Sequence, residues 1–161
     1  MIEIRKVRSS DAPQIATYLT KIGGETDNLS FGSEGLMMST ESIRTFIGNA
    51  DCYYVATDDG LIIGSAQLSP GRRRFSHKAE LAITVVKEYW GKGVATQLFK
   101  ALLAWAKAND IKKIDLEVRA DNLRAISFYK KMGFVYEGKD LRMFMIDNKF
   151  YDGEYWGLLL D

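Results

Sequence analysis

The chain has 161 residues, with 22 lysines and arginines against 21 aspartates and glutamates, for a formal net charge of +1. This balance excludes a nucleic-acid-binding domain that depends on bulk electrostatics, and a single cysteine, Cys52, excludes a disulfide framework. No apolar run approaches the roughly 20 residues of a membrane span, and the early charges predict no signal peptide, so we expect a cytoplasmic protein without membrane or nucleic-acid partners.

The first third of the chain predicts one strand and two helices. Apolar residues nearly alternate with charged ones over 2–7, which is typical of a strand. The stretch Ser9 to Pro13 then supplies a helix start with an N-cap and an early proline, and apolar residues continue at helical spacing to Ile22. We expect a mobile loop over 23–38 and a short second helix capped by Ser39.

Three strands are expected next. The runs 53–57 and 61–67 flank Asp58-Asp-Gly60, which is a strong hairpin turn. A second turn at Pro70-Gly71 follows, and the run 77–86 returns as the third strand.

The stretch 81–105 has the order strand, glycine loop, helix. Its first part is a short β-branched run, and from Val94 apolar residues recur at helical spacing. Gly91-Lys-Gly93 lies between the two parts. Glycines let a ligand approach the backbone, and the free amides of a helix's first turn attract negative charge, so this order predicts an anion site. The spacing fits neither a Walker loop nor a Rossmann fingerprint.

The last third predicts a helix over about 122–132 and two antiparallel strands. The strands are 134–146, with a break near Lys139-Asp140, and 154–160, and the segment 147–153 joins them. No repeat, linker or low-complexity segment occurs, so we expect a single domain over 1–161.

Other reactive side chains have structural interpretations. Cys52 is expected to be a buried thiol, His77 a surface residue, and Arg72-Arg-Arg74 a solvated hairpin tip. The chain has no cysteine pair and no histidine pair, so no metal site is expected. The aromatic residues interpreted as core are Trp105, Phe128 and Phe134.

Two motifs resemble those of a known family. Trp90-Gly-Lys-Gly-Val-Ala95 is similar to the acyl-CoA loop R/Q-x-x-G-x-G/A of the GNAT superfamily of N-acetyltransferases, with Trp90 in place of Arg or Gln. The stretch 114–134 resembles the family's signature L-x-V-x-x-x-N-x-x-A-x-x-x-Y-x-x-x-G-F almost position for position. The resemblance implies an α+β (α/β) fold of the acyl-CoA N-acyltransferase type. In that fold a mixed, mostly antiparallel sheet splays between two central parallel strands and is flanked by helices.

The resemblance also implies acetyl-CoA as co-substrate. Backbone groups of the strand before the loop would meet the thioester and pantetheine, and the loop amides would hold the pyrophosphate. Asn122 would touch the pantetheine arm and can also cap its helix. The implied acetyl-CoA-binding residues are Ile83, Thr84, Val85, Gly91, Lys92, Gly93, Val94, Ala95, Thr96, Asn122 and Tyr129.

Acetyl transfer to an amine needs a base for the amine and a proton donor for the departing thiolate. The resemblance implies Tyr129 as the general acid, with packing in the core as its alternative role. Glu117 matches the proton acceptor of the ribosomal-protein alanine N-acetyltransferase branch, and Glu80 stands where other branches place a base. A water relay to solvent is the third alternative for the base.

We therefore expect an enzyme that transfers the acetyl group of acetyl-CoA to a primary amine of a small or peptidic acceptor, by direct attack in a ternary complex. A non-catalytic acyl-CoA-binding protein and an acyltransferase for longer chains are the alternatives. The stretch 22–43 contains no lysine or arginine, which favours a cationic acceptor, although a solvated acidic loop explains it equally well. A homodimer is compatible with the resemblance. The acidic residues of this stretch are Glu25, Asp27, Glu34 and Glu41.

Overall fold

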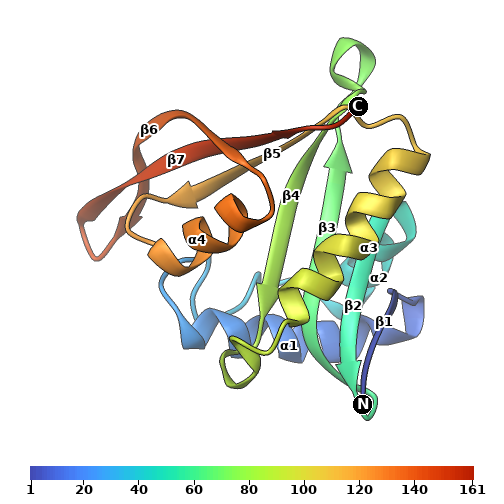
Figure 1. Ribbon diagram of the computed structural model, residues 1–161. Coiled ribbons are helices and arrows are strands. Elements are labelled where there is room, and N and C mark those ends of the chain that lie inside the picture. The colour runs from blue at the N-terminus through green and yellow to red at the C-terminus, as the bar shows by residue number, and fades with distance from the viewer. The chain divides into compact units, whose positions relative to one another are not determined.

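The computed structural model describes residues 1–161, which form seven strands and four α-helices (Figure 1). The strands are β1 (Ile2–Lys6), β2 (Cys52–Asp58), β3 (Leu61–Pro70), β4 (Lys78–Val85), β5 (Lys113–Arg119), β6 (Val135–Ile146) and β7 (Lys149–Leu159). The helices are α1 (Ala12–Glu25), α2 (Thr40–Asn49), α3 (Val94–Ala108) and α4 (Leu123–Lys131).

The strands form one mixed sheet in the order β1-β2-β3-β4-β5-β7-β6. Neighbours β1–β2, β2–β3, β5–β7 and β6–β7 pair antiparallel, whereas β4 and β5 pair in parallel. The parallel ladder is short and joins Lys78–Glu80 to Lys113–Asp115. The expected mixed, mostly antiparallel sheet with a central parallel pair is confirmed.

The chain divides into two compact units. The first comprises Met1–Ser69 and Ala82–Asn109, and the second comprises Pro70–Leu81 and Asp110–Asp161. The single domain expected over 1–161 stays a prediction. None of the helices combines the length and the apolar character that a bilayer crossing needs.

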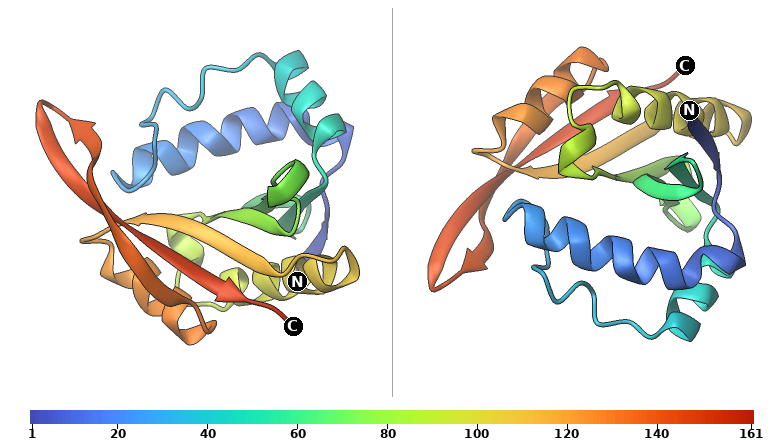
Figure 2. Two further views of the ribbon diagram at one scale, coloured as in Figure 1. Left: turned by 90° about the horizontal axis from the view of Figure 1, so that it is seen from above. Right: turned by 90° about the horizontal axis from the view of Figure 1, so that it is seen from below.

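In the first unit, α1 and α2 cover one face of the strands and α3 covers the other (Figure 2). The face that α3 turns to the sheet is buried through Val94, Leu98, Phe99, Leu102 and Ala106. Gly64 of β3 lets α3 pack closely, because a Cβ there would lie 3.0 Å from Leu98 and 3.2 Å from Val94. The periodicity of 94–106 therefore predicted the buried face, although Trp105 is only half-buried.

The hairpin and the start of α2 agree with the sequence, whereas the expected cap of α1 is absent. Asp59 and Gly60 form the β2–β3 turn with φ of 48° and 84°, as a two-residue hairpin loop requires. Ser39 accepts the backbone N–H of Ser42 at 3.1 Å and so caps α2. Asp11 precedes α1, but its carboxylate binds Arg5 at 2.8 Å instead of capping the helix.

The end of α1 differs from the prediction. The loop was expected to begin at residue 23, but α1 continues to Glu25. Gly23 is helical and lies against the following loop, since a Cβ there would be 1.9 Å from the carbonyl oxygen of Gly32. The glycine permits this close approach and does not end the helix.

In the second unit, α4 packs beside the strands β5, β7 and β6 (Figure 1). The tail strands correct one boundary, because β7 begins at Lys149 and only Asp147-Asn148 joins it to β6. Both turn residues have positive φ, 50° and 62°, a conformation that Asp and Asn tolerate. The expected break in β6 is confirmed as an irregular register between Asp140 and Phe144.

Candidate active site

The loop before α3 has the geometry of an anion site. Gly91 and Gly93 adopt φ of 75° and 79°, and Gly93 is the N-cap of α3 without a side-chain cap. The first intrahelical bond there is Gln97 N–H to the Gly93 carbonyl, at 3.1 Å, which leaves the preceding amides available. A Cβ on either glycine would meet no atom within 4 Å, so the approach to these amides is open. Such a helix start favours negative charge.

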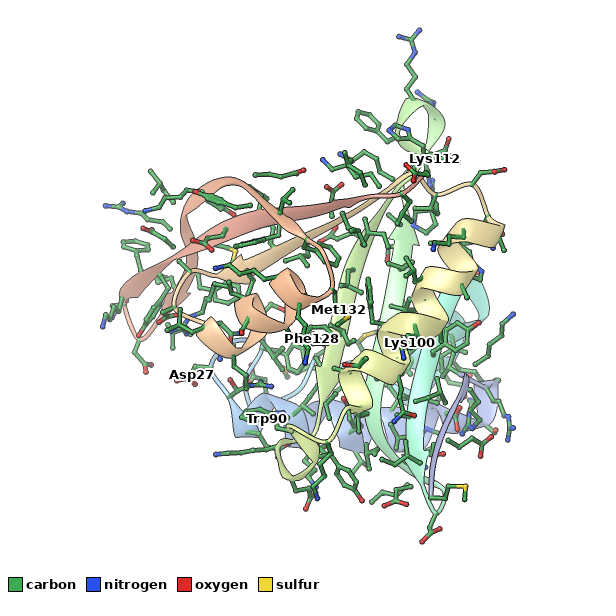
Figure 3. All side chains as sticks on the ribbon, in the orientation of Figure 1. Asp27, Trp90, Lys100, Lys112, Phe128 and Met132 are labelled. Atoms are coloured by element: carbon green, nitrogen blue, oxygen red, sulfur yellow. The ribbon has the colours of Figure 1, made fainter.

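Two aromatic residues tie the loop to the strands β2 and β4. Tyr89 donates its hydroxyl to the Asp58 carboxylate at 2.5 Å, and the ammonium of Lys92 lies 5.1 Å from the Tyr89 ring centre. This bond raises the pKa of Tyr89 and lowers the pKa of Asp58. Trp90 lies in the segment that leads into α3 (Figure 3), and its indole nitrogen donates to the Val85 carbonyl at 2.8 Å. Trp90, the departure from the family's Arg or Gln, therefore ties the loop to the end of β4.

The end of β4 carries the backbone positions predicted to meet the thioester. Ile83, Thr84 and Val85 are all half-buried. The carbonyl of Val85 already accepts one hydrogen bond, from Trp90, and the hydroxyl of Thr84 lies 2.8 Å from that of Tyr18 on α1. Tyr18 is only 3% exposed, and this burial raises its pKa. This end of β4 is therefore held by side chains from α1 and from the glycine loop.

The second unit brings together both carboxylates proposed as the base. Glu80 pairs with Asp115 in the parallel ladder, and Glu117 follows two residues later on β5, so the three side chains share one face of the sheet. Partial burial, a hydrogen bond with Asp140 and the charges of Asp140 and Glu80 raise the pKa of Glu117. A carboxylate with a raised pKa is better suited to accept a proton near neutral pH.

Two members of this cluster were missed by the sequence interpretation. Tyr155 lies opposite Glu117 in the β5–β7 ladder, and its pKa is raised by burial and then by Glu117 and Asp140. Asp140 lies on β6 opposite Gly153. The sequence indicated Asp140 only as part of a break in a strand. No local sequence pattern predicts that strand pairing through β7 brings Asp140 close to Glu117.

Tyr129 projects from α4 with an unused hydroxyl. Its ring contacts those of Phe128 and Phe134, with centres 5.6 and 5.7 Å away. Burial raises the pKa of Tyr129 to about 12, with Arg124 acting in the opposite direction. The hydroxyl makes no hydrogen bond within the chain, although the ring is packed, so both expected roles are compatible with its position.

Asn122 is the N-cap of α4, as expected. Its side-chain oxygen accepts the backbone N–H of Ala125 at 3.3 Å. The cap uses only the oxygen of this amide, so the side-chain nitrogen stays available to another partner.

The remaining sequence interpretations concern side chains for which a structural role was expected. Cys52 is buried, and burial raises the pKa of its thiol to about 11, which agrees with a structural role. His77 is exposed and contributes its carbonyl to the backbone N–H groups of Lys112 and Lys113. Phe134 is buried, but Phe128 is only half-buried and does not belong fully to the core.

The acidic side chains of residues 22–43 make hydrogen bonds and an ion pair within the chain. Glu34 accepts the backbone N–H of Gly32 at 2.9 Å, and Glu41 pairs with Arg44 one turn later on α2. Glu25 accepts the backbone N–H of Lys87 at 3.1 Å with one oxygen only. Arg44 therefore offsets the charge of Glu41, whereas Glu34 and Glu25 accept hydrogen bonds from neutral backbone groups.

Comparison with known proteins places the chain in a family. The model of the acetyltransferase (GNAT) family matches residues 25–134. N-alpha-acetyltransferase 30 of Schizosaccharomyces pombe is 39% identical over 85 residues, covering 50% of this chain and 55% of that protein. L-amino acid N-acetyltransferase AaaT of Escherichia coli is 31% identical over 106 residues, covering 63% of this chain and 64% of that protein. The chain thus spans less than two thirds of these curated relatives.

Solved structures agree with the family match. The acetyltransferase of GNAT family from Streptococcus pneumoniae superposes with a TM-score of 0.94 and 29% identity, covering 99% of this chain and 100% of that one. The ribosomal-protein-alanine N-acetyltransferase from Brucella melitensis has the same fold, with a TM-score of 0.87, 21% identity and coverage of 98% and 99%. Because the family model matches most of the sequence and the fold agrees, the chain belongs to the GNAT family of acetyltransferases.

Proposed function

We propose that the protein is an acetyl-CoA-dependent N-acetyltransferase that acts on primary amines by direct attack in a ternary complex. The observation that carries this proposal is the loop at Gly91–Gly93, with two left-handed glycines and an open, uncapped helix start. Relatives named as acting on amines support it: an L-amino acid N-acetyltransferase, spermidine N(1)-acetyltransferases and an N-alpha-acetyltransferase. The proposal also includes that the protein is cytoplasmic, that it forms a homodimer and that its acceptor is cationic.

The binding part of the proposal assigns roles to backbone groups. The amides of Gly91 to Thr96 would hold the pyrophosphate, because the positive end of α3 and its free N–H groups favour negative charge. Backbone groups of Ile83 to Val85 would polarise the thioester carbonyl as fixed dipoles. Asn122 would use its side-chain nitrogen on the pantetheine arm while its oxygen caps α4.

The proposed base is Glu117. It would take a proton from the acceptor ammonium, either directly or through water, before the amine nitrogen forms its bond to the acetyl carbon. Asp140 and Glu80 support this role, because neighbouring negative charge raises the pKa of Glu117. Glu80 itself is the second candidate for the base.

The proposed partner of the departing thiolate is Tyr129. As the carbon–sulfur bond breaks, the phenol would donate a hydrogen bond to sulfur. A free thiol has a pKa of about 8.5, well below the value of about 12 for Tyr129. Complete transfer of the phenolic proton is therefore unfavourable, so Tyr129 would stabilise the thiolate mainly as a hydrogen-bond donor.

The test is an acetyl-transfer assay with a panel of polyamines, aminoglycosides, amino acids and peptide N-termini. Release of the CoA thiol together with the mass of an acetylated product is the expected result. Preference for cationic acceptors, with kcat/KM falling as salt rises, would support steering by the acidic stretch. Binding of acetyl-CoA without turnover of any acceptor would favour a non-catalytic acyl-CoA-binding protein. Faster transfer from longer acyl-CoA thioesters would favour an acyltransferase for longer acyl chains.

A further inference from the structure

The C-terminal end of α1 carries a carboxylate. The aligned peptide dipoles place negative charge at this end of a helix, and the last residue of α1 is Glu25. No basic residue lies in the last turn, and the C-cap residue Thr26 makes no capping hydrogen bond. Lys21 lies one turn earlier and places some positive charge near Glu25, but its ammonium is paired with Glu88 at 2.5 Å. The carboxylate of Glu25 therefore lies at a helix end whose dipole disfavours negative charge.

One oxygen of this carboxylate has no partner. Oε2 of Glu25 accepts the backbone N–H of Lys87, whereas Oε1 is buried and makes no hydrogen bond. It is the only buried side-chain nitrogen or oxygen of the 161 residues in this condition. Burying a charged acceptor without a donor is costly, so a protein that keeps one is suited to receive a cationic donor there.

Glu25 faces the end of β4. Tyr18, Ile22 and Glu25 lie on one face of α1 because they are spaced by four and three residues. At the near end of this face Tyr18 contacts Thr84, and at the far end Glu25 contacts Lys87, about 10 Å along the helix. The unpaired oxygen therefore lies along the segment where the thioester is proposed to react.

We propose that Glu25 binds a second ammonium group of the acceptor, one that is not acetylated. The inference rests on the proposed function and narrows its substrate class to diamines and other acceptors with two amino groups. An ammonium paired with a carboxylate stays protonated, and a protonated amine cannot attack a thioester. The group held by Glu25 is therefore a recognition group, and a different amine of the same molecule reacts.

The other carboxylates of the acidic stretch provide a matched comparison. Glu34 lies in the same stretch and carries the same charge, but its carboxylate is bonded to the backbone N–H of Gly32 and is exposed. The variants Glu25→Gln and Glu34→Gln thus remove equal charge from the same stretch, and only the first removes the unpaired buried oxygen. Effects of general electrostatic steering would appear in both variants.

The first experiment compares 1,4-diaminobutane with n-butylamine as acceptors. We expect Glu25→Gln to lower kcat/KM for the diamine about tenfold or more, mainly through KM, and to leave butylamine unchanged. Glu34→Gln should leave the ratio of kcat/KM for the diamine to kcat/KM for butylamine at its wild-type value. Equal losses for both amines in Glu25→Gln, or an equal effect of Glu34→Gln, would overturn the inference.

The second experiment needs no turnover. Titration calorimetry should detect binding of 1,4-diaminobutane to the protein and at least tenfold weaker binding to Glu25→Gln. Absence of diamine binding to the wild-type protein, or equally tight binding to Glu25→Gln, would overturn the ammonium site. Failure of all acetyl transfer with diamine binding intact would instead reject the proposed function alone.

Folding of the variant can be checked independently. Glu25→Gln removes an unpaired charge from the negative end of α1, so its Tm should equal or exceed that of the unchanged protein. A lower Tm would show that the carboxylate is a structural tie for Lys87, and that result would also count against the recognition role.

Discussion

The indole nitrogen of Trp90 donates a hydrogen bond to the backbone oxygen of Val85 at 2.8 Å. This bond joins the glycine loop to the strand that precedes it, so the loop is fixed before any ligand arrives. Pre-organised backbone groups bind a ligand more tightly, because less ordering remains to be done on binding.

Trp90→Phe should therefore weaken acetyl-CoA binding by several-fold, since loss of one hydrogen bond costs about 1 kcal/mol. Calorimetry measures the Kd. Trp105→Phe is the control, because Trp105 is also half-buried but lies within α3, away from the loop. An unchanged Kd in Trp90→Phe would show that the loop keeps its shape without this bond.

Gly93→Val should weaken acetyl-CoA binding by about tenfold or more. A β-branched residue is strained at the observed φ of 79°, and its side chain would occupy the open space above the loop amides. Gly48→Ala is the control, because a Cβ there meets nothing within 4 Å and Gly48 lies inside α2. That control should gain up to about 1 kcal/mol of stability and keep its affinity. A folded Gly93→Val protein with unchanged affinity would contradict the loop assignment.

Tyr129→Phe should lower kcat about 100-fold and leave the Kd for acetyl-CoA nearly unchanged. The hydroxyl has no hydrogen-bond partner in the chain, so its loss should change the free energy of unfolding by less than about 0.5 kcal/mol. Steady-state kinetics and thermal unfolding of the same sample separate the two effects. If Tyr129→Phe lowers kcat by less than about threefold, the role of the Tyr129 ring is packing.

The pH profile of kcat/KM should report Glu117. Activity is expected to fall as pH drops through the raised pKa of this carboxyl, because protonation removes the base. Asp140→Asn removes a negative neighbour and so lowers the pKa of Glu117, which should move the acidic limb of the profile to lower pH.

Glu137→Gln is the control for this shift. Glu137 also lies on β6, but it pairs with Lys113 at 2.9 Å and is not among the causes of the Glu117 shift. Its variant should keep the acidic limb in place. If Glu117→Gln retains full activity and the same limb, the base is Glu80 or a water relay.

The turns, helix caps and buried helix face of the chain could be predicted from its sequence. Alternation, helical spacing and turn chemistry act over a few residues, which is why the Asp59-Gly60 hairpin, the caps Ser39 and Asn122 and the buried face of α3 agree with the structure. The errors arose where a distant segment overrides the local signal. Gly23 looked like a helix end because its contact with Gly32 is invisible in a linear pattern.

The sequence by itself determined the strand, glycine loop and helix at 81–105, because each part depends on neighbouring residues. Only the tertiary structure decided which carboxylates act on one another. Asp140 meets Glu117 because β7 lies between β5 and β6, and Glu80 joins them because β4 runs parallel to β5. Likewise the unpaired oxygen of Glu25 exists only because α1 lies against the segment after β4. Charge–charge interaction and burial depend on distance in space, and strand order sets that distance independently of separation along the chain.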